Sequence, residues 1–471
     1  WFDGTDVATT TVSVPDGVLV AGTNTLELTA PGDTGNPFDI MAYEGLAAAF
    51  TRAPQAVGGA WKGMIDQGGK FAITGFAGDV VAWRGDRRRT GTDTINLRGQ
   101  GHWIAVEVGE TLAPSIQADV PPASGRPPRG QVDYLIIAHD QFVATAALDD
   151  LQSLQQARGY STRVVAAEEI YAHYSDYERS AAAIGEFIRH ARPRFVLLVG
   201  GDSTDYHDHL GLASQSFVPT HYVQTDDLVT YAPADGPYVD FNGNGTPQAA
   251  IGRLPVRTED ELDLLVAKLQ TYLPPDTAHF SAGPSDSGRQ FAELSEGYAA
   301  SLSSAWAFEE TYADDFAVLA DANAALTDAL NGTGMLVSYL GHSSFGIWGL
   351  NPSHGILFRA NEARALANAA PHLITQWGCW NTYFVDPQLD TMANGFLLQD
   401  DGAAHVLGAA ALTDVNLLRQ FGERFFDEIG RQDTVGETLR FAIQRYIQAD
   451  PNAARALRGF AFLGDPAAPL Y

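Results

Sequence analysis

One cysteine occurs in the chain, and both it and a histidine come at the end of strand-like runs. Cys379 follows the apolar residues 373–378, and His342, 37 residues earlier, follows residues 335–341. The carboxyl ends of parallel strands are where open α/β sheets carry their sites, and a thiol there becomes a nucleophile when a nearby His takes its proton. The spacing therefore predicts a Cys–His pair. The alternative is that Cys379 is a small buried hydrophobic residue and that His342 only caps a strand.

A serine beside the histidine offers a different nucleophile. The sequence Gly-His-Ser-Ser-Phe at 341–345 follows a strand-like run, as does the Gly-x-Ser-x-Gly elbow that holds Ser at a strained turn. In that elbow the last Gly lets the helix pack close to the strand. Here Phe345 stands in its place. A serine hydrolase using Ser343 would also need Asp and His downstream, and Asp386 and His405 are available. This alternative stays open.

Two loops carry side chains that could bind a divalent cation. Residues 200–209 hold three Asp and two His, although Asp is also frequent in loops because it forms turns. Asp240, Asn242 and Asn244 stand at positions one, three and five of a calcium-loop pattern, with Gly at position six. Ile251 stands at position twelve, where an EF-hand has Glu, so a full EF-hand is excluded. Two interpretations of this loop stay open. It could hold a structural Ca²⁺ whose remaining ligands come from elsewhere in the chain, or it could be a plain Asn-Gly turn.

The composition excludes some classes of partner. The 471 residues carry 57 Asp and Glu against 29 Lys and Arg, for a formal net charge of −28. A field of this sign repels nucleic acid and anionic membranes. One cysteine permits no intrachain disulfide, and no run of 18 apolar residues predicts a membrane span. Because the sequence opens at Trp1 without Met or a signal peptide, we expect a truncated or processed form.

The period of the hydrophobic pattern changes along the chain. Polar and apolar residues alternate at 9–14, 25–29, 71–76 and 102–108, which predicts an all-β sandwich or jelly-roll domain over residues 1–119. The Pro-rich residues 120–131 predict a linker. In residues 132–471, continuous apolar runs at 134–138, 162–166 and 195–199 alternate with helical patterns at 146–158 and 181–192. Such alternation predicts βαβ units and a parallel sheet.

These residues together resemble peptidase family C25, the gingipain-type cysteine peptidases, which share a fold group with caspases and legumains. The similar segments are residues 134–137, 195–202, 250–256, 339–349, 378–379 and 463–466. The resemblance covers about 340 residues, and the β domain before them is similar to the leader domain of large members. It implies a caspase-like, three-layer αβα domain with mostly parallel sheets, divided into subdomains of about 132–275 and 276–471, each with its own sheet.

The resemblance also implies roles for particular residues. Cys379 would be the nucleophile and His342 the general base and acid, with Asp286 assisting the His. The backbone N–H groups of Cys379 and Ser343 would form the oxyanion hole, although the family usually has Gly where this chain has Ser343. Glu296 and Asp414 would supply the carboxylate of a primary specificity pocket, which predicts cleavage after Arg or Lys.

The sequence therefore predicts a secreted or cell-surface cysteine endopeptidase that acts on protein or peptide substrates through an acyl-enzyme. It predicts no required cofactor and no nucleic-acid partner, and it leaves the oligomeric state open. The alternatives are a sortase-like transpeptidase of the same family, the serine hydrolase using Ser343, and a catalytically inactive surface or adhesion module.

Overall fold

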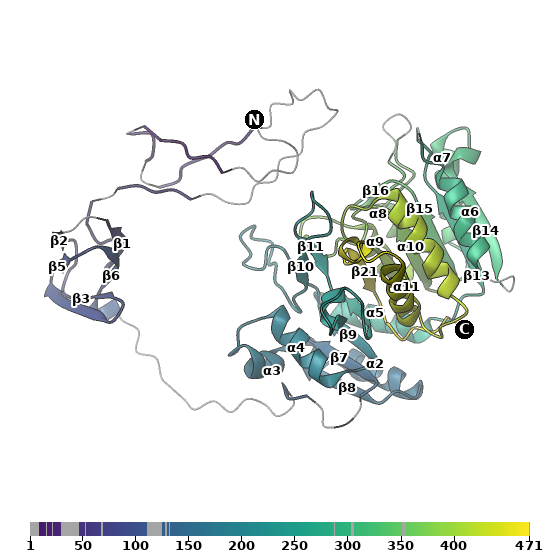
Figure 1. Cartoon of the computed structure of the whole chain (residues 1–471), viewed down its shortest axis with the longest axis horizontal. Coiled ribbons are helices and arrows are strands. Elements are labelled where there is room, and N and C mark those ends of the chain that lie inside the picture. The colour runs from purple at the N-terminus through teal and green to yellow at the C-terminus, as the bar shows by residue number, and fades with distance from the viewer. Residues whose placement is uncertain are drawn as a thin grey trace. The chain divides into compact units, whose positions relative to one another are not determined.

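The computed structural model describes residues 9–15, 17–20, 22–29, 47–51, 53–66, 69–110, 125–127, 130, 132–286, 288–302, 306–350 and 355–470. The chain divides into two compact units, Val7–Asp119 and Val120–Tyr471, coloured purple to blue and blue to yellow in Figure 1. Most of the predicted linker 120–131 lies outside the described residues. In the part of the chain that the structure describes, no helix has the length and apolar character needed to cross a bilayer.

The first unit contains two small antiparallel sheets. One has the order β1-β6-β3-β4 and the other pairs β2 with β5. The strands are β1 (Ala60–Ile65), β2 (Lys70–Ile73), β3 (Asp79–Arg84), β4 (Arg87–Thr92), β5 (Ile95–Arg98) and β6 (Gly101–Glu107). Trp61, Val80, Leu97 and Trp103 belong to their shared core.

Two of the four predicted strands of this unit are confirmed, and two are wrong. Residues 71–76 and 102–108 correspond to β2 and β6, whereas residues 9–14 and 25–29 form no strand and are exposed. An alternating pattern becomes a strand only when a partner strand takes its backbone hydrogen bonds and a core takes its apolar face. Within the described residues of this unit, neither is found for these two runs.

Ten strands of the second unit form one sheet in the order β14-β13-β15-β19-β20-β21-β12-β9-β7-β8. Neighbours run parallel except β20 and β21, which are antiparallel. In chain order the strands are β7 (Tyr134–Ala138), β8 (Thr162–Ala166), β9 (Phe195–Val199), β12 (Ala250–Leu254), β13 (Thr277–Ala282), β14 (Ala307–Tyr312), β15 (Leu336–Leu340), β19 (His372–Trp377), β20 (Ala403–Ala409) and β21 (Phe460–Leu463). The mostly parallel sheet confirms the predicted fold class.

The first half of this sheet is buried on both faces, which explains its continuous apolar strands. Ile136 of β7 lies in one core with the helices α2 (Ala146–Ala157) and α5 (Glu259–Thr271). Its neighbour Ile137 lies in a second core with α3 (Ala167–Tyr174) and α4 (Ala181–Ala191). Successive side chains of a strand point to opposite faces, so a helix layer covers each side (Figure 1).

The second half is likewise covered on both faces. Trp377 of β19 packs against Tyr298 of α6 (Phe291–Ser301) and Phe421 of α10 (Val415–Glu428). On the other face Tyr339 of β15 stacks on Trp348, which contacts Phe396 of α9 (Met392–Leu397). The remaining elements are α1 (Asp140–Val143), α7 (Leu319–Leu330), α8 (Ala360–Ala363), α11 (Val435–Ala449), α12 (Ala453–Leu457), the hairpin of β10 (His221–Val223) and β11 (Ala232–Ala234), and the small sheet of β16 (Ser343–Ser344), β17 (Ile347–Trp348) and β18 (Phe358–Arg359).

The two halves share one sheet, which corrects the implied separate sheet for each subdomain. β21 pairs antiparallel with β20 on one side and contacts β12 at a single parallel pair, Arg253 with Leu463, on the other. The last strand of the chain thus returns to the middle of the sheet and joins the halves.

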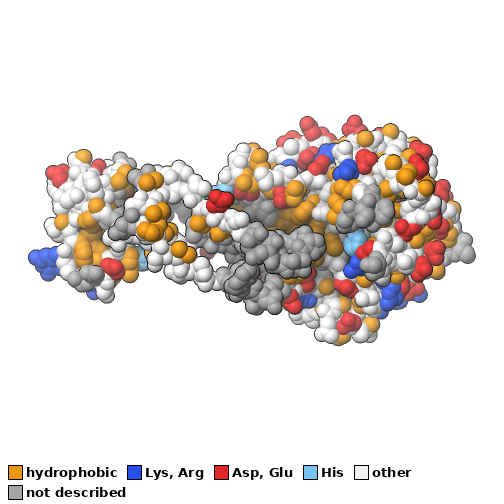
Figure 2. Space-filling view, turned by 90° about the horizontal axis from the view of Figure 1, so that it is seen from above, with side chains coloured by type: hydrophobic (Ala, Val, Ile, Leu, Met, Phe, Trp, Pro, Cys, Tyr) orange, Lys and Arg blue, Asp and Glu red, His pale blue; other side chains and the backbone are white. Residues whose placement is uncertain are grey.

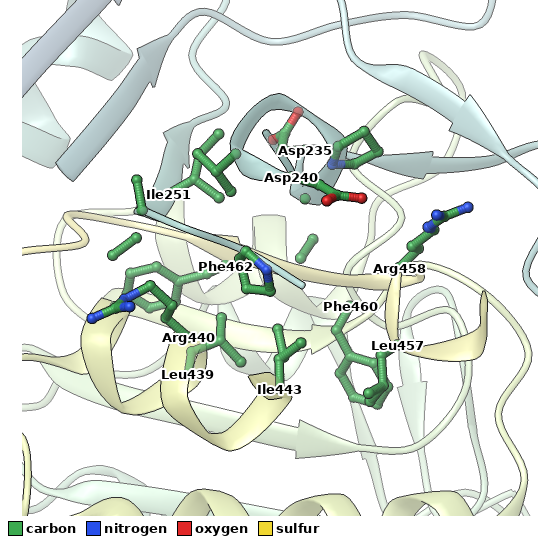
Figure 3. Close-up of a pocket in the computed structure, with 18 of the residues that line it drawn as sticks. Asp235, Asp240, Ile251, Leu439, Arg440, Ile443, Leu457, Arg458, Phe460 and Phe462 are labelled. Atoms are coloured by element: carbon green, nitrogen blue, oxygen red, sulfur yellow. The ribbon is translucent and has the colours of Figure 1, made fainter. Parts of the chain in front are cut away.

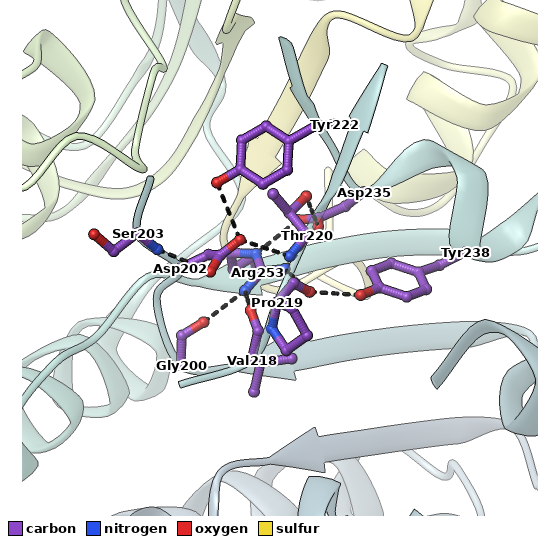
Figure 4. Close-up of polar contacts among 10 residues, drawn as sticks. All are labelled: Gly200, Asp202, Ser203, Val218, Pro219, Thr220, Tyr222, Asp235, Tyr238 and Arg253. Carbon is purple, nitrogen blue, oxygen red and sulfur yellow. Dashed lines mark hydrogen bonds and ion pairs between the residues drawn. The ribbon is translucent and has the colours of Figure 1, made fainter. Parts of the chain in front are cut away.

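A buried ion pair fixes the β12 side of that junction. The Arg253 guanidinium is fully buried and pairs with both carboxylate oxygens of Asp235, at 2.6 and 2.7 Å (Figure 4). It also donates to the carbonyl oxygens of Gly200, Val218 and Pro219. A charge in such surroundings is tolerated because these acceptors replace water. The network ties β12 to the loops that follow β9 and β11.

Candidate active site

Adjacent parallel strands bring His342 and Cys379 to one edge of the sheet. Leu340 at the end of β15 pairs with Trp377 at the end of β19, and each candidate residue comes two positions later. The Gly341 N–H donates to the Trp377 carbonyl, so the pairing continues one step past the strand. The predicted placement of the two residues at neighbouring strand ends is confirmed.

The two loops pack without space between them. Ser343 Oγ donates to the Cys379 carbonyl at 2.9 Å and accepts from Asn381 Nδ2 at 3.1 Å. A Cβ at Gly378 would lie 2.1 Å from Ser343 Oγ and 2.6 Å from the Gly341 carbonyl oxygen, which no side chain tolerates. Gly378 is therefore required directly before the cysteine, because it lets the two loops approach.

His342 is held by both its ring and its backbone. Its Nε2 lies 2.7 Å from Asp286 Oδ2, and its ring packs edge-on against Phe291 at a centroid distance of 5.3 Å. Its carbonyl accepts from the Tyr339 hydroxyl at 2.7 Å and from the Gly349 N–H at 2.8 Å. These contacts restrict the imidazole to one orientation at the end of β15.

Asp286 lies in the loop after β13, the other neighbour of β15 in the sheet. Arg289 Nη1 donates to the same Oδ2 atom at 2.7 Å. The hydrogen bond from His342 and then the contacts with Arg289 lower the pKa of Asp286 below its ordinary value of 3.8. The side chain is 29% exposed, so solvent weakens both interactions. The carboxylate is ionised at neutral pH and can orient the His342 ring.

The thiol of Cys379 lies against Thr413, in the loop after β20. Sγ is 3.4 Å from both the backbone nitrogen and Oγ1 of Thr413 and 3.7 Å from its carbonyl oxygen. The N–H can donate to a thiolate, and the carbonyl can accept from the thiol. Asp286, His342, Cys379 and Thr413 thus follow four successive strands of the sheet, in the order β13-β15-β19-β20.

The residues of the serine-hydrolase alternative do not form a triad. The Ser343 hydroxyl donates to a carbonyl, and Asp386 Oδ1 accepts from the Gln388 and Leu389 backbone nitrogens. His405 is fully buried in β20, and its Nδ1 accepts from the Asp465 N–H. Burial lowers the pKa of His405 to about 3. Each member therefore has partners outside the proposed triad.

The two predicted pocket acids lie in different surroundings. Glu296 is exposed on α6, more than one helical turn beyond Phe291. Asp414 follows the thiol's neighbour Thr413 and caps α10, with Oδ1 accepting from the Asn416 and Leu417 backbone nitrogens. Among the described residues, Glu296 makes no recorded contact with Cys379, His342 or Asp414.

The loops considered for metal binding use their oxygens on their own backbone. Asp240 accepts from the Asn244 and Gly245 nitrogens, and Asn244 Oδ1 accepts from the Thr246 nitrogen. In the loop at 200–209, Asp202, Asp205 and Asp208 each accept from backbone nitrogens as well. Across the described ranges, no three His, Cys, Asp or Glu side chains gather closely enough to hold a metal.

A pocket of about 60 Å³ lies beside the Asp240 loop, apart from the strand ends that carry the cysteine. Figure 3 shows Asp235 and Asp240 on one side of it and Leu439, Arg440 and Ile443 of α11 on the other. None of the four strand-end residues lines it.

The sequence patterns did not reveal three of the residues around the pair. Thr413 looks like a residue before a helix cap, Arg289 and Phe291 like ordinary loop and helix residues. Only the folded chain brings Thr413 within 3.4 Å of a thiol that precedes it by 34 positions.

The model of peptidase family C25 matches residues 127–471, which is most of the chain. The chain belongs to peptidase family C25. The family is one of cysteine-type peptidases, and this member is therefore a cysteine-type peptidase whose substrate is protein or peptide. The matched residues include both His342 and Cys379.

Solved structures show that the C25 fold extends through this unit. The crystal structure of the Arg-specific cysteine proteinase gingipain R (RgpB) matches with a TM-score of 0.55 and 19% identity, covering 73% of this chain and 79% of that chain. The complex of the pro- and mature domains of Porphyromonas gingivalis RgpB matches with 0.53 and 17%, over 72% and 79%. A structure described only as a protease matches with 0.56 and 16%, over 72% and 78%. No curated protein matches the sequence.

Proposed function

We propose that this C25 member is an endopeptidase in which Cys379 attacks the scissile carbonyl and His342 serves first as general base and then as general acid. The observation that supports this most is the alignment of Asp286, His342 and Cys379 on three successive strand ends. An acyl-enzyme would form on Sγ, the amine would leave with a proton from His342, and water would release the acid product.

The hydrogen bond to Asp286 supports a specific tautomer for the neutral His342 ring. The ionised carboxylate accepts a hydrogen bond from Nε2–H, so in the neutral ring Nδ1 carries the free lone pair. Nδ1 is then the atom that takes the thiol proton. Asp286 is a positioning residue in this proposal, since it acts through the imidazole.

Two backbone N–H groups are available for the developing oxyanion. The Gly349 N–H donates to the carbonyl of the opposite residue, His342. Hydrogen-bonded and non-hydrogen-bonded pairs alternate along an antiparallel hairpin, so the next pair, Ser343 with Trp348, is a non-hydrogen-bonded one. The Ser343 N–H is thus left out of the ladder. Within the described residues no acceptor is recorded for the Cys379 N–H either. Donors aimed at the carbonyl oxygen stabilise the charge that forms during attack.

We further propose cleavage after Arg or Lys. Acidic side chains are scattered over the visible face in Figure 2, so the net charge of −28 does not by itself mark a pocket. Asp414 has the better placement of the two predicted acids, because it adjoins Thr413 at the thiol. Its Oδ2 makes no recorded bond among the described residues, and a substrate guanidinium would pair with it.

The remaining parts of the proposal come from the family resemblance. We propose that the enzyme acts outside the cytoplasm, at the cell surface or in the medium, and that it needs no cofactor for the chemical step. The location is tested by treating intact cells with a protease that cannot enter them. A protein at the cell surface should be degraded in treated cells and intact in untreated cells, and a secreted protein should be found in the medium.

The test of the mechanism is labelling with an acyloxymethyl ketone that carries Arg at its first position. The probe should modify Cys379 in the wild type, and modification should be lost in Cys379→Ala and strongly reduced in His342→Ala. Ser343→Ala should keep substantial activity, because that hydroxyl is bonded to a carbonyl. An inactive Ser343→Ala with an active Cys379→Ala would favour the serine hydrolase, and absence of labelling would favour an inactive module. Peptide ligation to an added amine in place of hydrolysis would favour the transpeptidase.

A further inference from the structure

Three aromatic rings form a patch beside the candidate nucleophile. Phe345, Trp380 and Tyr383 contact one another, with centroid distances of 5.5 Å for Phe345–Trp380 and 5.4 Å for the other two pairs. All three residues are partly exposed. We call these three residues the aromatic patch.

The patch is attached to the same two loops as the reacting groups. Trp380 is bonded directly to Cys379, and Phe345 stands two residues after the oxyanion candidate Ser343. The Tyr383 N–H donates to the Trp380 carbonyl at 3.2 Å, and the Phe345 carbonyl accepts from the first residue of α9 at 2.7 Å. A chain bound at the thiol would therefore pass close to this patch.

The backbone at Trp380 has an unusual conformation for such a side chain. Its φ is +62°, in the left-handed region that Gly and Asn occupy at least cost. The Trp380 N–H is fixed by the Ala411 carbonyl at 3.0 Å. The Trp380 side chain packs against the small cluster of Val229, Ala232 and Ala411. This packing accounts for the buried part of the Trp380 side chain. It gives no structural reason for the part that remains exposed.

We infer that the aromatic patch is a subsite for an apolar, preferably aromatic, side chain of the substrate, at a position flanking the residue after which the enzyme cleaves. This inference rests on the proposed peptidase mechanism. Rigid rings give a large contact area at little cost in side-chain entropy, and aromatic pairs add a specific attraction. The patch carries no charge to pair with a basic residue, whereas Asp414, on the Thr413 side of the thiol, does.

The experiment uses the full chain and peptides with Arg fixed at the cleavage position. The two positions before Arg and the two positions after it are varied, one at a time, among Phe, Leu, Ala and Asp. In the wild type, one flanking position should favour Phe over Ala by about tenfold or more in kcat/KM, mainly through a lower KM. Trp380→Gly, which suits the positive φ, and Phe345→Ala should each reduce that ratio several-fold.

Phe308→Ala is the matched control, because Phe308 is a 44% exposed aromatic residue near the amino end of β14, the edge opposite the reacting loops. It should leave the Phe-to-Ala ratio unchanged. Cleavage after Arg with no flanking preference, or a preference that survives in both patch variants, would overturn this inference alone. Failure of the wild type to cleave any of the peptides would overturn both the inference and the proposed specificity.

Discussion

Replacing Asp286 by Asn tests whether the carboxylate positions His342. The change keeps the size of the side chain and removes its charge, so Nε2 loses a charged acceptor at 2.7 Å. A hydrogen bond to an ionised group is worth about 1.5–3 kcal/mol, and partial exposure reduces this to about 1–2 kcal/mol for the folded state. The Asn amide can also present N–H to the ring and favour the wrong tautomer.

The expected catalytic effect is larger than the effect on stability. If the ring spends most of its time misoriented, the barrier should rise by about 1.4–2.8 kcal/mol, which is about ten- to hundredfold in kcat. KM should change less than about twofold, because Asp286 does not touch the substrate and its loss should act mainly on kcat. Asp286→Glu should recover part of the loss. The assay is steady-state hydrolysis of an Arg peptide, with thermal unfolding to confirm the fold.

The stability effect should depend on pH in a defined direction. Because His342 and then Arg289 lower the pKa of Asp286, the carboxylate stabilises the folded state fully above its ordinary value of 3.8. This contribution is lost as the pH falls through the lower folded-state pKa. The stability difference between wild type and Asp286→Asn should therefore be present at neutral pH and vanish in acid. Urea unfolding at several pH values measures it.

Arg289→Ala is the matched control for Asp286→Asn. Arg289 donates to the same Oδ2 atom but does not contact His342, so its loss should reduce kcat by no more than about threefold, as expected for a 45% exposed ion pair. Equal, small effects of both variants on kcat would refute a positioning role for Asp286.

Three further outcomes follow from the structure. If the Asp240 loop binds Ca²⁺, added Ca²⁺ should raise the melting temperature of the wild type by a few degrees and leave Asp240→Ala unchanged; a flat titration of both would reduce the loop to a turn. Arg253→Met should lower the free energy of unfolding by about 3–5 kcal/mol in urea, because Asp235 is left as a buried unpaired charge; a loss under about 1 kcal/mol would contradict that reading. In a positional peptide library, Asp414→Asn should reduce the preference for Arg more than Glu296→Gln does, and a wild-type preference for apolar or acidic residues at the cleavage position would reject the pocket.

The strands of the α/β unit could be predicted because burial on both faces leaves a direct record in sequence. The runs at 134–138, 162–166 and 195–199 match β7, β8 and β9 residue for residue. At the start of α5, Thr258 Oγ1 accepts from the Glu261 N–H, and the Glu261 carboxylate accepts from the Arg257 N–H, which is a capping pattern set by residues close in sequence. This helix-start signal is local, because residues within a few positions supply its hydrogen-bond partners.

The sequence by itself determined that Cys379 and His342 end two buried strands, because a strand's carboxyl end can be read from where its apolar run stops. The family resemblance added Asp286. Tertiary structure decided which strands are neighbours, how β21 joins the two halves, and which side chains from distant loops reach the pair. Asp286 meets His342 across 56 positions, and Thr413 meets Cys379 across 34. The alternating runs at 9–14 and 25–29 show the converse, since they have no partner strand among the residues that the structure describes. A local pattern shows which side chains of a segment will be buried. Only the folded chain shows which other segments those side chains pack against.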